Sequence, residues 1–171
     1  MRQADTDAMI RVDQAGEFGA ARIYAGQLAV LGDRHPMARE IRHMASQEAR
    51  HLEKFNAMMA ERGVRPTALH PFWHVAGYAL GAGTALLGPQ MAMACTAAVE
   101  TEIDRHYAEQ LAELGESDPE LSDAIRDFQA EEIEHKDAAI ASGAETIPGY
   151  PLFAAAIRFG CRTAIALSKR V

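Results

Sequence analysis

The chain has 171 residues, of which 49% are hydrophobic and 6% are aromatic, and its formal net charge at pH 7 is −7. This length suits one domain with a substantial core, and the acidic balance argues against a nucleic-acid-binding protein, which would normally be basic. The two cysteines, Cys95 and Cys161, form neither a C-x-x-C pair nor a disulfide framework. We therefore expect a protein of a reducing compartment.

Two long helices are predicted at the start of the chain. The first covers about residues 6–31, where Gly32 ends it, and the second begins near Pro36 and stops at Gly63. On the first helix, Glu17 shares a face with large nonpolar residues seven positions away on each side. The inner stripe of the second helix is apolar except for a carboxylate and an imidazole in its middle, and it contains Ile41, Met44, Glu48, His51, Leu52, Phe55 and Met58 or Met59.

The next stretch, residues 66–99, contains no Asp, Glu, Lys or Arg. Pro71 and the Gly88-Pro89 pair delimit a helix over residues 72–87, with aromatic residues at one end. At about 16 residues, this helix is shorter than the ~20 residues that span a bilayer. We expect it to lie in a membrane interface or over a lipid site, and a buried connecting helix is the alternative.

Three further helices are predicted. The third bundle helix covers about residues 89–114, and the fourth begins at Asp118-Pro119 and ends at Gly143. Residues 100–145 are strongly acidic, whereas the segment after Pro151 carries four bases and no acid. This last helix is amphipathic and basic, which is typical of a helix resting on an anionic membrane, although an ordinary packing helix fits equally well.

The second and fourth bundle helices carry the same short motif. Glu48-Ala49-Arg50-His51 and Glu132-Ile133-Glu134-His135 each place a carboxylate and an imidazole on one side of a helix. Each motif is preceded by an isolated glutamate among small and apolar residues, Glu17 at 31 positions and Glu100 at 32 positions. One Glu-x-x-His motif is a weak signal, but two with nearly equal spacing are a strong one.

These motifs belong to an internal repeat in which residues 10–58 and 93–139 have parallel inner faces. We expect two helical hairpins that pack with approximate two-fold symmetry. The apolar segment 66–88 then supplies the long crossover of a ferritin-like topology. The predicted fold is all-α: a single domain over residues 1–171, built as a ferritin-like four-helix bundle with a long apolar crossover helix and an extra C-terminal amphipathic helix.

The four glutamates of the repeat predict a centre for two metal ions. A buried carboxylate costs several kcal/mol unless it is paired or bound to a metal, and no stripe of Lys or Arg faces these residues. Oxygen and imidazole donors without thiolate favour iron or manganese over structural zinc, and six protein ligands leave positions open for O₂ activation. The predicted ligands are two bridging carboxylates, Glu48 and Glu132, with Glu17, His51, Glu100 and His135 each serving one ion.

Other polar residues near the motifs are assigned less specific positions. For His106 two positions are possible: one near the ligands or the substrate, and one on the plain surface of a helix. Gly81-Ala82-Gly83-Thr84-Ala85-Leu86-Leu87-Gly88 does not match a nucleotide-binding fingerprint, and its glycines fit close helix packing better. We expect five carboxylates to be solvated or to lie beside the ligands, and three histidines to be structural or on the surface: Glu102, Asp104, Glu131, Glu134 and Asp137, and His43, His70 and His74.

Several segments resemble the demethoxyubiquinone hydroxylases of ubiquinone biosynthesis, and together they extend over nearly the whole chain. They are VDQAGEFGA at residues 12–20, RIYAGQ at 22–27, GAGTALLG at 81–88, AVE at 98–100, EEIEH at 131–135 and GCR at 160–162. The resemblance implies a di-iron, ferritin-like monooxygenase that hydroxylates the ring of a demethoxylated, polyprenylated quinol. The iron ligands that the resemblance implies for this chain are Glu17, Glu48, His51, Glu100, Glu132 and His135.

This interpretation has consequences for cofactors and partners. Two iron ions and O₂ are expected, with two electrons from NADH or another reductant, and Tyr107 and His106 as residues that assist this transfer. The expected partners are a polyprenylated quinone, a membrane surface, other ubiquinone-biosynthesis proteins and a second copy of the chain, but no nucleic acid. In eukaryotes, members of the resembled family pair with a lipid-binding protein.

The resemblance also implies a location at the inner membrane. We expect a peripheral protein on the cytoplasmic face of a bacterial inner membrane, or on the matrix side of the mitochondrial inner membrane if the source is eukaryotic. The chain starts with neither a charged region followed by an apolar one nor an Arg- and Ser-rich leader. A prenylated ring resides in the bilayer, so its enzyme needs an apolar entrance that faces the membrane. We expect membrane-facing segments at about residues 66–94 and 150–171.

Other functions fit the same ligand pattern. A ferritin-like iron store or ferroxidase would form a hollow multimer and leave the uncharged stretch unexplained. A rubrerythrin-like peroxidase or a manganese catalase is a further alternative, but the C-x-x-C pairs of a rubredoxin-type module are absent from the sequence. A purely structural bundle at a membrane would not need the six ligand positions, and the acidic net charge disfavours a di-iron tRNA hydroxylase.

Overall fold

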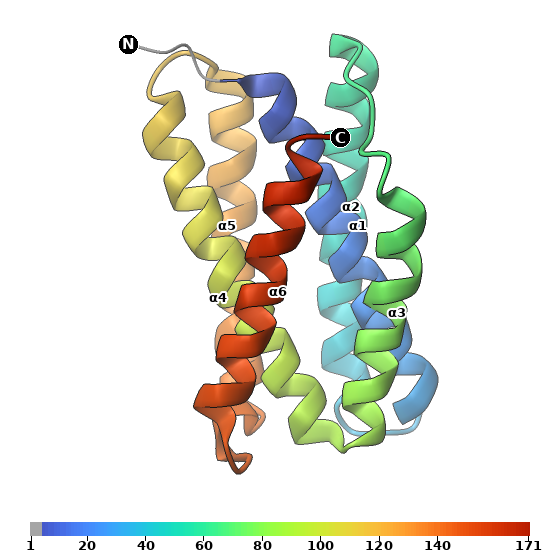
Figure 1. The fold of residues 1–171 in the computed structure, drawn as a ribbon. Helices are drawn as coiled ribbons and strands as arrows, with labels where there is room; N and C mark the ends of the chain where they lie inside the picture. The colour runs from blue at the N-terminus through green and yellow to red at the C-terminus, as the bar shows by residue number, and fades with distance from the viewer. Residues whose placement is uncertain (1–4) are drawn as a thin grey trace.

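The computed structural model describes residues 5–171, and all of the regular structure in that range is helical (Figure 1). This confirms the predicted all-α, ferritin-like bundle, although residues 1–4 of the expected domain lie outside the described residues. The elements in chain order are α1 (Thr6–Leu31), α2 (Ala38–Arg62), α3 (His70–Leu86), α4 (Pro89–Leu114), α5 (Pro119–Ala141), the short 3₁₀ helix η1 (Ala144–Thr146) and α6 (Tyr150–Ser168).

Local signals in the sequence fix most of the helix ends. The Asp5 carboxylate caps α1 by accepting a hydrogen bond from a backbone N–H of the first turn at 3.1 Å. Gly63 ends α2 in the left-handed region, with a φ of 68°, where most side chains would be strained. The start of α2 differs from the prediction, because a turn over residues 33–37 includes Pro36 and delays the helix to Ala38.

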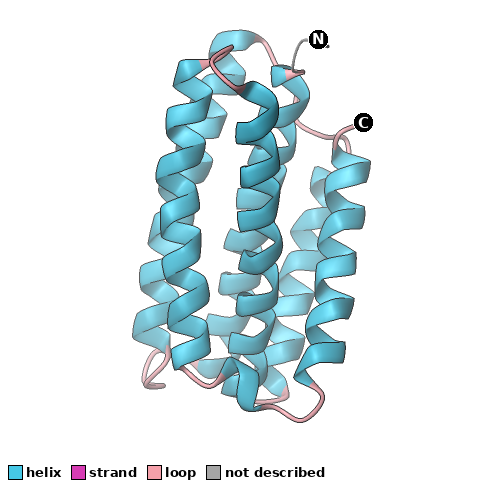
Figure 2. Cartoon of the chain, turned by 90° about the vertical axis from the view of Figure 1, so that its left-hand side faces the viewer, coloured by secondary structure: helices cyan, strands magenta, loops and turns pink. Residues whose placement is uncertain are grey.

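The helices pair as two hairpins joined by a crossover. α1 packs against α2, and α4 packs against α5, while α3 lies along α1 before the chain enters α4 (Figure 1). In the view turned by 90°, the helices lie side by side and the loops are at the ends of the bundle (Figure 2). α6 runs along α4 on the same side of the bundle as α3, and the Trp73 indole donates a hydrogen bond to the Ser168 hydroxyl at 3.1 Å between these two helices. The internal repeat therefore corresponds to two packed hairpins, with the uncharged segment between them.

Glycines bring α1 and α3 into close contact. A Cβ atom at Gly81 would collide with the carbonyl oxygen of Ile23, and one at Gly26 would collide with the carbonyl oxygen of Tyr78. The prediction that the glycine run serves helix packing is confirmed at Gly81. Gly83 is different, since open space surrounds the position that its Cβ would take.

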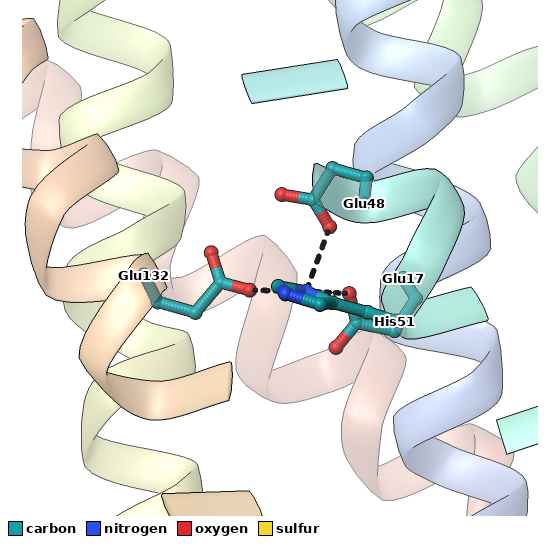
Figure 3. Close-up of side chains that lie close together, drawn as sticks. All are labelled: Glu17, Glu48, His51 and Glu132. Carbon is teal, nitrogen blue, oxygen red and sulfur yellow. Dashed lines mark hydrogen bonds and ion pairs between the residues drawn. The ribbon is translucent and has the colours of Figure 1, made fainter. Parts of the chain in front are cut away.

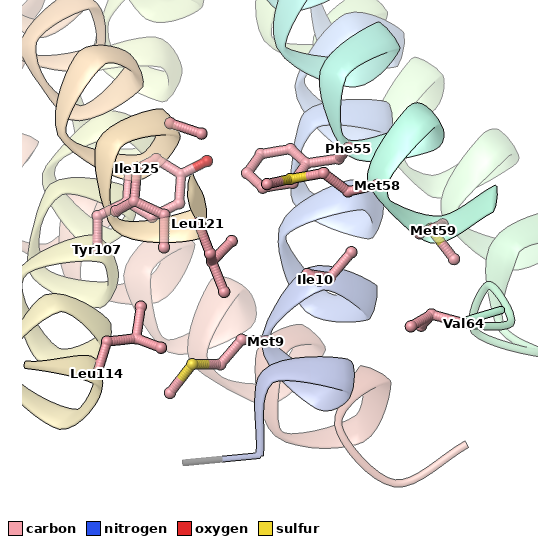
Figure 4. Packing of buried hydrophobic residues seen from close by; sticks show 11 residues of the cluster. Met9, Ile10, Phe55, Met58, Met59, Val64, Tyr107, Leu114, Leu121 and Ile125 are labelled. Carbon is pink, nitrogen blue, oxygen red and sulfur yellow. The ribbon is translucent and has the colours of Figure 1, made fainter. Parts of the chain in front are cut away.

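Two apolar clusters flank the middle of the bundle. The first lies where α1 and α5 begin and α2 and α4 end (Figure 4). The second lies toward the other end of the same four helices and includes residues of α3 and η1. The first includes Ile10, Phe55, Met58, Leu121 and Ile125, and the second includes Tyr24, Ile41, Met44, Met93 and Ala139.

Large hydrophobic side chains are exposed on α3 and α6, among them Phe72, Leu86, Leu152 and Phe159. The membrane-facing segment expected at residues 66–94 nevertheless ends earlier than residue 94. Residues 92–94 are fully buried, because α4 begins at Pro89 and its first turns pack against α3 and α5 in the second cluster. Within residues 5–171, no helix combines the length and the apolar character needed to cross a membrane.

Candidate metal centre

Six buried polar side chains meet between the two apolar clusters. They come from the middle of α1, α2, α4 and α5, and none is more than 3% exposed. Their donor atoms fall into two groups, in each of which the atoms lie within 4.8 Å of one another. The first group (Figure 3) contains Glu17, Glu48, His51 and Glu132, and the second contains Glu48, Glu100, Glu132 and His135. The structure thus brings together all six residues that the sequence singled out.

Glu48 and Glu132 belong to both groups because they lie between the two imidazoles. His51 Nδ1 is 3.2 Å from Glu132 Oε1 and 3.8 Å from Glu48 Oε2. His135 Nδ1 is 3.0 Å from Glu132 Oε2 and 3.3 Å from Glu48 Oε1. Each carboxylate therefore presents one oxygen to each imidazole, an arrangement that lets one carboxylate serve two cations.

The isolated glutamates are held by tyrosines from the opposite hairpin. The Tyr24 hydroxyl on α1 donates a hydrogen bond to Glu100 Oε1 on α4 at 2.8 Å. The Tyr107 hydroxyl on α4 donates a hydrogen bond to Glu17 Oε1 on α1. The tyrosine that follows each isolated glutamate by seven positions thus fixes the glutamate of the other half.

The charges of the cluster are balanced only in part. Burial and repulsion from Glu132 raise the pKa of Glu48 well above its ordinary value, and the same causes raise the pKa of Glu100. Burial also opposes ionisation of Glu132, but hydrogen bonds with His135 and His51 outweigh it and lower the pKa of Glu132. Without a bound cation, Glu48 and Glu100 therefore hold their protons to higher pH than free carboxyl groups do.

The residues of the cluster fit divalent cations. Both oxygens of Glu48 are buried, and neither accepts a hydrogen bond from any group within residues 5–171. A cavity of about 20 Å³ lies among the carboxylates. Cations at this position would supply the missing partners, and a set of carboxylate and imidazole donors suits iron or manganese.

His106 is buried, so of its two predicted positions the plain helix surface is excluded. His106 Nε2 is 3.4 Å from Asp13 Oδ1, which also accepts a hydrogen bond from Gln110 Nε2 at 2.8 Å. Burial raises the pKa of Asp13 despite these two neighbours. His106, Tyr107 and Asp13 line the small cavity beside the cluster. Asp13 was not among the residues predicted for the site, and its one signal in the sequence is its position one helical turn before Glu17.

Two further residues contact the outer nitrogens of the two histidines. Glu131 Oε2 is 2.9 Å from His51 Nε2, and Gln47 Oε1 is 3.0 Å from His135 Nε2. Glu131 was expected either in solvent or beside the ligands, and it lies beside the predicted ligand His51. Gln47 was missed, although the repeat contains the signal: each of the two residues directly precedes a Glu-x-x-His motif.

Glu102 differs from the expectation, since it is buried rather than solvated and its ion pairs are with arginines rather than with the cluster. Its side chain is fully buried and pairs with Arg105 on its own helix and with Arg158 Nε on α6 at 3.2 Å. It therefore ties α6 to α4. The expected exposed positions are confirmed at Glu134, Asp137, His43 and His74, whereas Asp104 and His70 are half-buried.

An apolar cavity of about 360 Å³ adjoins the cluster and is lined by residues of α1, α3, α4 and α6. Five residues line both this cavity and the small one among the carboxylates: Val12, Gly16, Ala20, Ile103 and Ile165. The two spaces are therefore neighbours. A molecule in the larger cavity would lie beside the carboxylate and histidine cluster.

The fold and the site define a class of protein: an all-helical, ferritin-like bundle whose buried carboxylate and histidine cluster adjoins an apolar cavity. The family model described as "Ubiquinone biosynthesis protein COQ7" matches residues 4–168, and the chain belongs to that family. The resemblance seen in the sequence segments is thereby confirmed.

Curated relatives agree with this assignment. A protein of Rhodospirillum rubrum named 3-demethoxyubiquinol 3-hydroxylase is 52% identical over 165 residues, which cover 96% of this chain and 78% of the relative. Proteins of Mus musculus and Homo sapiens are both named NADPH-dependent 3-demethoxyubiquinone 3-hydroxylase, mitochondrial. They are 52% and 51% identical over 99% of this chain, and the alignments cover 80% and 79% of those proteins.

Proposed function

We propose that the chain is a di-iron monooxygenase that hydroxylates the ring of a demethoxylated polyprenyl quinol with O₂ and two electrons. The observation that carries this proposal is the pair of donor groups that share Glu48 and Glu132, next to an apolar cavity of about 360 Å³. The reaction itself is taken from the names of the relatives, which are 3-hydroxylases of demethoxyubiquinol or demethoxyubiquinone.

The proposed ligands are the six buried residues of the two groups. One iron would be held by Glu17 and His51 and the other by Glu100 and His135, with the carboxylates of Glu48 and Glu132 available to both. Iron bound there would supply the redox chemistry that activates O₂. The protein holds these ligands in place through the two tyrosine hydrogen bonds and keeps water away by burial.

The quinol ring is proposed to bind in the larger cavity. Its volume lies within the usual range for small-molecule sites, and its walls are mainly apolar side chains and glycines. Val99 and Ile103 on α4 contribute to the wall near the cluster. A ring in this position would lie close to the metals, while the polyprenyl tail would leave between α3 and α6.

The electrons are proposed to come from NADH or another reduced nicotinamide cofactor, since several relatives are named as NADPH-dependent. Tyr107 and His106 are the proposed residues for electron transfer. Both line the small cavity, and Tyr107 also donates a hydrogen bond to the proposed ligand Glu17.

The tail of the substrate implies a membrane surface as a partner. We propose peripheral attachment through α3 and α6, on the cytoplasmic face of a bacterial inner membrane or the matrix side of the mitochondrial one. The exposed apolar residues of both helices and the exposed bases Lys169 and Arg170 at the end of α6 support this. Other proteins of ubiquinone biosynthesis and a second copy of the chain are the proposed protein partners. Iron storage and peroxidase activity are disfavoured, because neither uses an apolar cavity of this size beside the metals.

The ligand assignment is tested by replacing a shared carboxylate. Glu132→Ala should abolish both iron loading and hydroxylation, because each metal position loses a donor. The matched control is Glu134→Ala, two residues away and exposed, which should retain both. Iron content after anaerobic reconstitution with Fe²⁺, measured together with turnover, checks the prediction. Retained iron and activity in Glu132→Ala would contradict it.

A further inference from the structure

The two histidines of the cluster have the same orientation. His51 turns Nδ1 toward Glu17 and Glu132, both at 3.2 Å, and His135 turns Nδ1 toward Glu132 at 3.0 Å and Glu48 at 3.3 Å. In both rings Nε2 points away from the shared carboxylates. If Nδ1 binds a metal, the proton of a neutral imidazole must reside on Nε2, which then needs a hydrogen-bond acceptor.

The acceptors are related by the internal repeat but differ in chemistry. Glu131 on α5 offers a carboxylate oxygen to His51 Nε2 on α2 at 2.9 Å. Gln47 on α2 offers an amide oxygen to His135 Nε2 on α5 at 3.0 Å. Each acceptor directly precedes the Glu-x-x-His motif of the other hairpin. The same contact is therefore made twice, once by a charged group and once by a neutral one.

The charged acceptor is itself held in place. Arg50 donates two hydrogen bonds to the Glu131 carboxylate, at 2.8 and 3.0 Å, and this contact lies at the partly exposed edge of the bundle. The guanidinium keeps Glu131 oriented toward His51. The tyrosine contacts do not distinguish the two halves in this way, since each isolated glutamate accepts a hydrogen bond from one tyrosine.

A carboxylate acceptor makes an imidazole a better metal ligand than an amide does. It forms a charge-assisted hydrogen bond with the Nε2 proton and increases the electron density at Nδ1. Loss of such a hydrogen-bond partner typically weakens metal binding by about 10- to 100-fold. The metal position served by His51 has this support, and the one served by His135 does not.

We propose that Glu131 and Gln47 are positioning residues that make the two metal positions unequal, so that the position of Glu17 and His51 binds its ion more tightly than the position of Glu100 and His135. This inference rests on the ligand assignment of the proposed function. Its consequence is an order of loading: when metal is limiting, the His51 position fills first and the His135 position loses its ion first.

Exchange of the two acceptors tests the inference. The metal-free full chain is titrated with Fe²⁺ under anaerobic conditions, with calorimetry to resolve the two binding steps. The wild type should show two steps of unequal affinity. Glu131→Gln should weaken the tighter step by about tenfold or more and leave the weaker step nearly unchanged. Gln47→Glu should strengthen the weaker step. The double variant, with both acceptors exchanged, should again show two unequal steps.

Arg50→Gln is the matched control, because it removes the ion pair of Glu131 but keeps the carboxylate beside His51. It should weaken the tighter step less than Glu131→Gln does, and circular dichroism should show the same helix content in all variants. Equal binding steps in the wild type, or a Glu131→Gln variant that weakens both steps alike, would overturn the inference. Failure of the wild type to bind Fe²⁺ would instead overturn the proposed function.

Discussion

At the scale of single residues, Glu48 shows how the proposed metal role opposes the stability of the metal-free protein. Its carboxylate is buried and accepts no hydrogen bond within the described residues 5–171. Burial and the neighbouring Glu132 raise the pKa of Glu48 well above the ordinary value of 4.5. A carboxyl with a raised pKa contributes stability below its ordinary pKa, and this contribution is lost as the pH rises through the folded-state value.

We therefore predict that the metal-free protein loses stability as the pH rises from about 5 to 8. Glu48 and Glu100 both act in this direction. Burial opposes the charge of His51, but its hydrogen bonds to Glu132 and Glu17 raise the pKa of His51 to about 10, so the stability that this charge contributes also declines as the pH rises from 6.5 toward 10. The lowered pKa of Glu132 has its effect only below pH 4.5, outside this window. Thermal unfolding at several pH values measures the trend, and a rise in stability toward pH 8 would contradict it.

A substitution isolates the contribution of Glu48. Glu48→Gln should stabilise the metal-free protein at pH 8 by about 1–3 kcal/mol, because it removes a buried charge and keeps the shape of the side chain. The same change should weaken metal binding. Glu53→Gln on the exposed side of α2 is the control and should change neither property appreciably. Denaturant unfolding with and without Fe²⁺ separates the two effects. An unchanged or lower metal-free stability in Glu48→Gln would contradict the electrostatic account.

At the scale of the elements, α3 depends on glycine to approach α1. Gly81→Ala should lower the free energy of unfolding by about 1–3 kcal/mol, because the new methyl group collides with backbone atoms of Ile23. Gly83→Ala lies on the same helix with open space around it, so it should be neutral or stabilising by up to about 1 kcal/mol. Chemical denaturation of both variants measures the difference. Equal effects of the two substitutions would mean that α3 does not need this close contact.

The helices and the six cluster residues could be predicted from the sequence, because helix periodicity and the spacing of the repeat determine which side chains share a face. Features that depend on contacts between elements could not. The burial of Glu102 beneath arginines follows from how α4 packs against α6. The contact of Gln47 with His135 likewise joins two hairpins. The repeat relates Gln47 to Glu131, but only the packing shows what each one touches.

At the scale of the whole molecule, the exposed apolar side chains of α3 and α6 lie on the helices that also line the larger cavity. This places the proposed membrane surface at the entrance for a prenylated substrate. Arg158 of α6 is paired with Glu102, whereas Lys169 and Arg170 at the end of this helix are exposed and would face anionic headgroups.

Vesicle binding tests this surface. The double variant Phe72→Ser and Phe159→Ser should reduce partitioning onto vesicles with anionic lipid by about tenfold or more, because two large exposed apolar groups are lost. Ile133→Ser removes an exposed apolar residue from α5 and should leave partitioning nearly unchanged. Cosedimentation with vesicles measures both. If the control reduces binding as much as the double variant, α3 and α6 are not the attachment surface.

The proposed function requires that iron at the cluster directs oxygen from O₂ into a quinol ring held in the adjoining cavity. The mass of the product formed from a demethoxyubiquinol by the iron-loaded protein, with NADH as reductant and ¹⁸O₂ as the oxidant, tests this requirement. We expect a hydroxylated quinol that contains one ¹⁸O atom. An unlabelled product, or no product from protein that holds two irons per chain, would contradict it.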